Sequence, residues 1–163
     1  MNKIKWIAPL FVLTVMLTSC PYTSKVTIDN PTVKLNPALL GKWEPKSTSD
    51  DRYVITKDKD DEFTYKIEKK SKDQKDPTVY KAFISMVDGD SFINIWEDNS
   101  STDKSYYFYK LELNANKDKI TLTPITENIT ETFAKPEDLK AFIKKYKSLS
   151  FFFDKNQDVY LKD

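Results

Sequence analysis

Between Leu39 and Leu122 the sequence is a series of short segments, rich in β-branched and aromatic residues, that are separated by polar turns. From Phe63 to Ile67 apolar and polar residues alternate, which is the period of a half-buried strand. The segments 79–87 and 92–96 flank Asp88-Gly89, a two-residue turn that suits a β-hairpin because glycine tolerates positive φ. The pattern predicts an antiparallel meander of about seven strands.

One segment near the C-terminus has the period of a helix instead. Four apolar residues recur there with the spacing i, i+3, i+4 and i+7: Leu139, Phe142, Ile143 and Tyr146. Pro136 fits the first helical turn, acidic residues follow it, and lysines gather toward the other end, where they complement the helix dipole. We expect one amphipathic helix on the outside of the sheet with its apolar stripe inward. A last strand is predicted at Val159–Leu161.

The segment Leu39–Glu44 contains the Gly-x-Trp pattern of the first calycin strand and resembles the opening of many small bacterial lipoproteins. Together with about eight strands and a helix before the last one, it resembles a lipocalin-like (calycin) β-barrel over residues 38–163. The resemblance implies a mainly β fold in which Gly41 and Trp43 close one barrel end. It also implies a basic side chain from the last strand over the tryptophan, a role for Lys162. A half-open β-roll or a β-sandwich is the alternative.

The N-terminus has the parts of a bacterial export signal. A basic head, Met1–Lys5, precedes an apolar run at Trp6–Met16 that is much shorter than the about 20 apolar residues of a membrane-spanning helix. Leu17-Thr18-Ser19-Cys20 resembles the lipobox of bacterial lipoproteins. The resemblance implies that residues 1–19 are a signal peptide and that acyl groups on Cys20 hold the protein to a membrane. The alternative is an ordinary signal peptide that leaves Cys20 as a free thiol.

Residues 20–37 precede the strand pattern and contain several prolines. We expect a flexible lipidated tether here, in which Val26–Ile28 could add one short strand. No aspartate follows Cys20 directly and no acidic run lies nearby. By resemblance to the sorting rules of double-membrane bacteria, this favours the periplasmic face of the outer membrane.

The composition argues against several classes of function. The chain has no histidine, which removes imidazole acid–base chemistry, histidine-assisted nucleophiles and histidine-ligated zinc. It has only two glycines, too few for a phosphate-binding loop or a dinucleotide fingerprint. Its 26 basic and 25 acidic residues are nearly balanced, whereas nucleic acid selects for clustered basic charge. We therefore expect a protein that is not an enzyme and has no cofactor and no nucleic-acid partner.

Two acidic segments resemble calcium-binding loops without completing the pattern. Asp154–Asp158 matches the first ligand positions of an EF-hand, but Val159 stands where the loop requires glycine. Asp58–Glu62 lacks this glycine as well. We expect two solvated turns and no metal site.

Two functions remain open, because an eight-stranded barrel either fills its interior with side chains or holds one small ligand. The side chains expected to point inward are large: Phe63, Tyr65, Ile67, Ile84, Phe92, Tyr107, Tyr109 and Leu111. Each aromatic ring buries about 150 to 250 Å². We therefore expect a packed interior and favour an interaction module that binds an envelope protein through its outer surface. The alternative is a carrier or sensor of a small apolar ligand inside the barrel.

The candidate contact residues for either function are aromatic. Three consecutive phenylalanines begin at Phe151, and they cannot all face one way in an extended strand. At least one of them is expected to be exposed, to cover the helix or to touch a partner. The candidates for ligand or partner contact are Tyr65, Tyr107, Tyr109, Phe151, Phe152 and Phe153.

Overall fold

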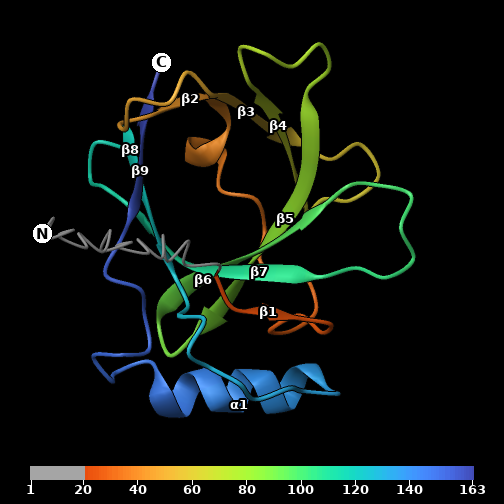
Figure 1. Cartoon of the computed structure of the whole chain (residues 1–163), viewed down its shortest axis with the longest axis vertical. Coiled ribbons are helices and arrows are strands. Elements are labelled where there is room, and N and C mark those ends of the chain that lie inside the picture. The colour runs from red at the N-terminus through yellow and green to blue at the C-terminus, as the bar shows by residue number, and fades with distance from the viewer. Residues whose placement is uncertain (1–20) are drawn as a thin grey trace, which may run out of the picture.

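The computed structural model of the chain describes residues 21–163, and the expected signal peptide and Cys20 lie outside this range. The strands β2 to β9 form a closed up-and-down barrel in which each strand pairs antiparallel with the next and β9 pairs with β2. Figure 1 shows this ring of strands with α1 outside it. The predicted fold class, a mainly β barrel with one helix before the last strand, is confirmed, and it is consistent with the calycin resemblance.

The barrel strands follow the meander predicted from the alternation of side chains. Their bounds are β2 Gly41–Pro45, β3 Arg52–Lys57, β4 Tyr65–Lys70, β5 Thr78–Val87, β6 Asp90–Glu97, β7 Tyr106–Leu113, β8 Lys119–Pro124 and β9 Asp158–Lys162. The predicted hairpin joins β5 to β6 through Asp88 and Gly89, whose φ angles are 49° and 86°. Positive φ at both central residues is what a tight hairpin of this twist requires.

Alternation along each strand separates an inner from an outer apolar cluster. In β6, Ile93 and Ile95 point into the barrel, whereas Phe92 and Asn94 point outward. The expectation that Phe92 faces inward is therefore wrong by one residue of register, which reverses the face of a strand residue. Phe63 was also expected inside, but it lies in the turn before β4.

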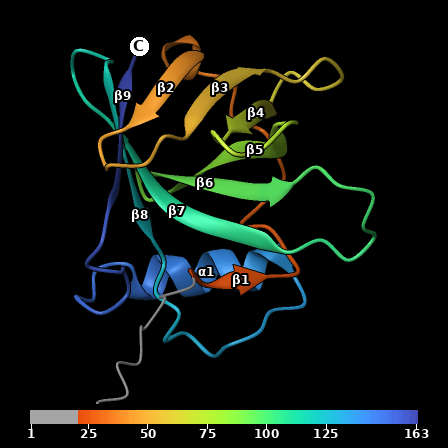
Figure 2. The same ribbon diagram turned by 45° about the horizontal axis from the view of Figure 1, so that its top comes forward.

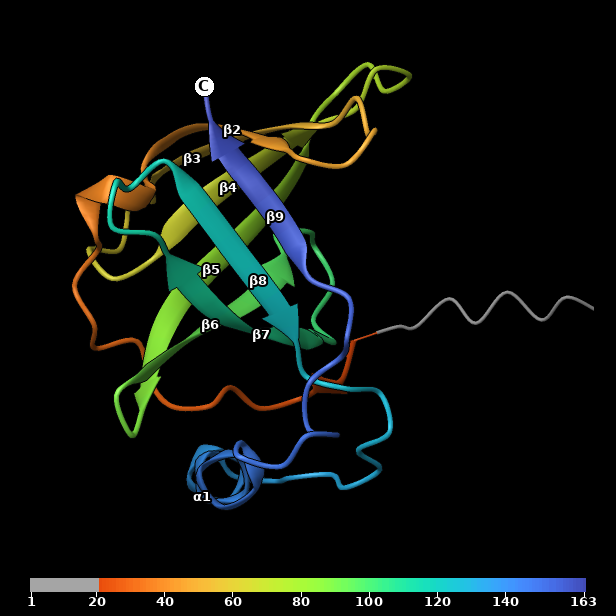
Figure 3. The same ribbon diagram turned by 90° about the vertical axis from the view of Figure 1, so that its left-hand side faces the viewer.

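The helix α1, Pro136–Tyr146, covers the outer cluster. Its apolar stripe is buried through Leu139 and Ile143, next to Phe92 and Phe108 of the barrel. Figure 3 shows the strands crossing the barrel at an angle, with α1 seen end-on beside them. Lys144 Nζ lies 3.1 Å from Asp88 Oδ1 and so ties the helix to the β5–β6 turn. The predicted position of the helix outside the sheet is confirmed.

The segment expected to be a flexible tether is packed on the barrel from Tyr22 onward. Its strand is β1, Thr23–Ser24, and not Val26–Ile28; it pairs with Tyr106 and Tyr107 at the start of β7. This edge of β7 is free to pair because β8 reaches only as far as Tyr109. Figures 1 and 2 show β1 on the side of the barrel where α1 lies.

Candidate functional site

One end of the barrel is closed by Trp43 and a short 3₁₀ helix, η1, Pro37–Leu39. Trp43 is 1% exposed, and its Nε1 donates a hydrogen bond of 2.9 Å to the Leu39 carbonyl oxygen. Lys162 Nζ lies 5.2 Å from the centre of the Trp43 ring and donates to the Ala38 carbonyl oxygen at 2.8 Å. Gly41 has φ +127°, and a Cβ at this position would lie 3.2 Å from Lys162 Cε. The structure thus places Lys162 next to both Gly41 and Trp43 at the closed end of the barrel.

The interior beyond this closed end is hollow. It contains a cavity of about 320 Å³, whereas a packed interior was expected. The expected filling is incomplete because Phe63 and Phe92 do not point inward and the other large side chains stand around the wall. The deep wall is buried and mainly apolar: Leu39, Trp43, Tyr65, Ile67, Ile93 and Ile120.

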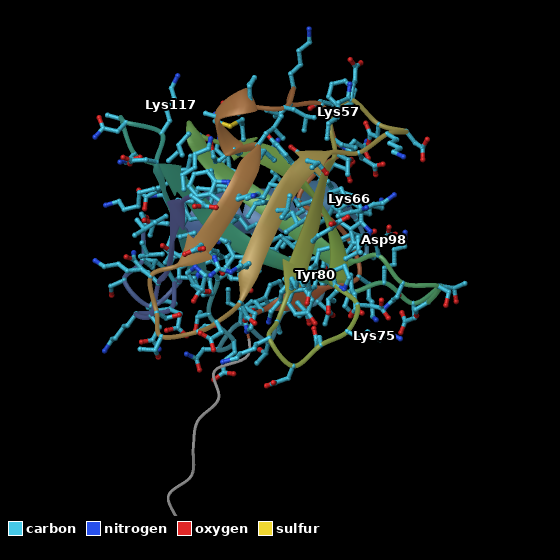
Figure 4. All side chains as sticks on the ribbon, turned by 90° about the horizontal axis from the view of Figure 1, so that it is seen from above. Lys57, Lys66, Lys75, Tyr80, Asp98 and Lys117 are labelled. Carbon is cyan, nitrogen blue, oxygen red and sulfur yellow. The ribbon has the colours of Figure 1, made fainter. Side chains whose placement is uncertain are left out.

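The cavity opens at the opposite end, where its wall becomes polar. Three strands place a charged residue at the outermost inward-facing position: Lys69 on β4, Glu97 on β6 and Asp158 on β9. Glu97 and Asp158 are exposed, unlike the deep wall. In Figure 4, Tyr80 and Lys75 lie toward this end, and Lys57 and Lys117 toward the closed end. We call the surroundings of these three charged residues the cavity mouth.

Between the mouth and the deep wall lies a belt of tyrosine side chains: Tyr53, Tyr80, Tyr107, Tyr109 and Tyr160. The rings of Tyr53 and Tyr160 meet edge to face, with centres 5.1 Å apart. Burial raises the pKa of Tyr53, Tyr80, Tyr109 and Tyr160 above the ordinary value of tyrosine. Tyrosine is already neutral over the physiological pH range, so these hydroxyls can donate hydrogen bonds to a ligand.

Of the three charged residues at the mouth, only Lys69 forms an ion pair within the described residues. Lys69 Nζ lies 3.0 Å from Asp51 Oδ2, and this contact raises the pKa of Lys69, while hydrogen bonds from Ser71 and Lys69 lower that of Asp51. Among residues 21–163, neither Glu97 nor Asp158 has an ion-pair partner. Partial burial at the mouth raises the pKa of Asp158, and the negative charge of Asp154 adds to the effect.

Replacing Asp158 with asparagine is expected to stabilise the fold at neutral pH by up to about 1 kcal/mol. Because its folded-state pKa is raised, the contribution of Asp158 to native stability falls as pH rises from the ordinary aspartate pKa of about 3.9 through the raised value. Asparagine avoids this loss, so the gain should vanish below about pH 4. Urea melts of the variant and of Glu112→Gln, an exposed control, measure it at both pH values. A variant less stable than wild type at neutral pH would contradict the prediction.

The six aromatic residues predicted as contacts lie in two places. Tyr65, Tyr107 and Tyr109 line the cavity. The phenylalanines lie outside the barrel, where Phe151 is 65% exposed, Phe152 is buried in the outer cluster and Phe153 packs against it. Sequence reasoning missed the other residues of the mouth and of the tyrosine belt: Tyr53, Lys69, Tyr80, Glu97, Asp158 and Tyr160. The alternation that places Tyr65 and Ile67 inward extends to Lys69, so the sequence pattern could have identified this residue.

Two features of the described residues bear on the kind of site. Within residues 21–163, no three acidic or cysteine side chains converge as metal ligands would. In the same part of the chain, no helix has the length and apolar character needed to span a membrane. No protein-family model, no curated protein and no solved structure matches the chain in comparisons with known proteins.

Proposed function

We propose that this protein is a lipid-anchored, non-enzymatic protein of the bacterial cell envelope that binds one small, largely apolar ligand inside its barrel. The observation that supports this most is the cavity of about 320 Å³, closed by Trp43 and open at the other end. Ligand pockets occupy about 300–1,000 Å³ and are mostly apolar with a few polar groups. The interior of a barrel that served only as a scaffold would be expected to be close-packed, without a cavity of this size.

The same proposal includes anchoring through acyl groups on Cys20, at the periplasmic face of the outer membrane. Tyr22 follows this cysteine by two residues and is already buried, with its backbone N–H donating to the Ile125 carbonyl oxygen at 3.0 Å. Thr23 pairs with Tyr107, a residue of the tyrosine belt. An anchor at Cys20 would therefore hold the open end of the barrel near the bilayer, which suits a ligand that is exchanged with the membrane.

Anchoring predicts that Cys20→Ala releases the protein in soluble form. Each buried acyl CH₂ contributes about 0.8 kcal/mol to membrane binding, so loss of the acyl chains removes the anchor. Fractionation of cells that express the wild-type chain or the variant measures this directly. If Cys20→Ala still sediments with membranes after a salt wash, another anchor exists and this part of the proposal fails.

Ligand binding predicts saturable uptake of an apolar probe at one site. We expect residues 21–163 to bind the neutral dye N-phenyl-1-naphthylamine with a rise in its fluorescence. Ile95→Trp adds bulk to the cavity wall and should weaken dye binding by about tenfold or more, because an overfilled cavity has no room for the dye. Val54→Trp introduces the same residue at an outward-facing position of β3, between Tyr53 and Ile55 of the cavity wall, and is the matched control. Absence of saturable binding to the unaltered protein would refute the proposal.

A second candidate, an interaction module that uses the outer surface, is favoured by one observation. Phe151 is 65% exposed and Leu149 is 38% exposed, close to the C-terminal end of α1. A photo-crosslinker introduced at position 151 in the expressing host tests this candidate. Capture of one protein, lost on Leu149→Ser and kept on Ile95→Trp, would assign the partner to this surface rather than to the cavity.

A further inference from the structure

We infer that the ligand of the barrel is an organic cation: an amine or quaternary ammonium group at one end of a small apolar body. This inference rests on the proposed ligand binding and adds the chemical class of the ligand. The apolar body of the ligand would lie against the deep wall, next to Trp43 and Ile93. Its cationic group would lie within the tyrosine belt, close to Glu97 and Asp158 of the mouth.

The charged residues of the mouth are the first evidence for a cationic ligand. Three charged side chains border the opening, and the one cation among them, Lys69, is already bound to Asp51 at 3.0 Å. Glu97 and Asp158 have no ion-pair partner among the described residues. Of the lysines in the adjoining loops, Lys72 lies 3.6 Å from Asp50, and Lys104 lies over the Trp96 ring. The three charged residues that line the mouth therefore have a net negative charge, which a cationic ligand would neutralise.

The tyrosine belt is the second piece of evidence, because it favours an organic cation. Aromatic faces attract cations through the ring quadrupole, and rings that surround a site are a known means of binding quaternary ammonium groups. Five tyrosines from four strands line the space just inside the carboxylates. Tyrosine hydroxyls are neutral at physiological pH, and burial raises the pKa of Tyr109 and Tyr160 further, so these side chains add no negative charge to the site. Rings beside separated carboxylates suit a weakly hydrated organic cation.

The alternatives fit these groups less well. The carboxylate of an anionic ligand would face Glu97 and Asp158, with only the already neutralised Lys69 to attract it. A neutral ligand would cover Asp158 without compensating its charge, and burying an uncompensated charge is costly. An inorganic cation would need converging oxygen ligands, and no group of three acidic side chains converges within residues 21–163.

The experiment compares three probes with the same apolar chain: octyltrimethylammonium, 1-octanol and octanoate. Residues 21–163 include the complete barrel, β1 and α1 and are titrated with each probe by calorimetry at low and at physiological salt. We expect octyltrimethylammonium to bind about tenfold or more tightly than 1-octanol, and octanoate to bind most weakly. The preference for the cation should decrease as salt rises, because the mouth is partly open to solvent.

Variants assign the preference to the two carboxylates. The double variant Glu97→Gln with Asp158→Asn should lose about tenfold or more in affinity for octyltrimethylammonium and keep its affinity for 1-octanol. Glu112→Gln removes an exposed, outward-facing carboxylate of β7 and should change neither. Equal or tighter binding of 1-octanol or octanoate to the unaltered protein would overturn the inference while leaving ligand binding intact. Failure of all three probes to bind would instead count against the proposed function itself.

Discussion

Replacing Trp43 with alanine is expected to lower the free energy of unfolding by about 3–5 kcal/mol, the cost of truncating a large side chain in a core. Trp43 is among the largest fully buried side chains of the described residues. Its loss would also leave the Leu39 carbonyl oxygen without its indole donor and remove the surface on which Lys162 rests. Urea unfolding measures the effect as a lower midpoint, with the slope checked for a change in the surface exposed.

Lys162→Ala is the control for this prediction, because it removes the lysine that lies over the Trp43 ring and leaves the buried indole in place. Lys162 is exposed, so its contact with the Trp43 ring is expected to contribute less than about 1 kcal/mol. The two variants should thus differ severalfold in their effect on stability. An unchanged urea midpoint for Trp43→Ala would show that the closed end of the barrel does not depend on this residue.

Replacing Ile28 with alanine is expected to lower the free energy of unfolding by about 2–5 kcal/mol. Ile28 is 0% exposed and lies in the outer cluster with Leu139 and Phe92, between α1 and the barrel. Its backbone N–H donates to Asn94 Oδ1 at 2.9 Å, so its position is held by a buried hydrogen bond as well as by packing. A residue of a flexible tether would show almost no effect, which makes this variant decisive for the N-terminal segment.

Lys25→Ala is the matched control in the same segment. Lys25 Nζ lies 2.8 Å from Asp103 Oδ1, but both side chains are more than half exposed. An exposed ion pair contributes about 0–1 kcal/mol, so this variant should stay close to wild type. If Ile28→Ala behaved like Lys25→Ala in urea, the packed segment would not belong to the cooperative fold.

The sequence by itself determined the local elements of this protein. The alternation in β4, the Asp88-Gly89 turn between β5 and β6, and the helical spacing of Leu139 and Ile143 each depend on residues close together in the chain. Period and turn chemistry act over a few residues, so they can be recognised without the fold. The Gly-x-Trp pattern then indicated how the strands would close, and the structure has a closed barrel.

Only the tertiary structure decided which groups meet. Glu97 and Asp158 come from strands far apart in the chain, and nothing local to either predicts that they border one opening. The packing of Ile28 depends on an outer barrel face that α1 alone does not cover. The cavity likewise depends on how inward-facing side chains from eight strands fill a common volume. The volume of the cavity and the net charge of its mouth depend on residues that are distant in the chain. Both are therefore defined only once the barrel has closed.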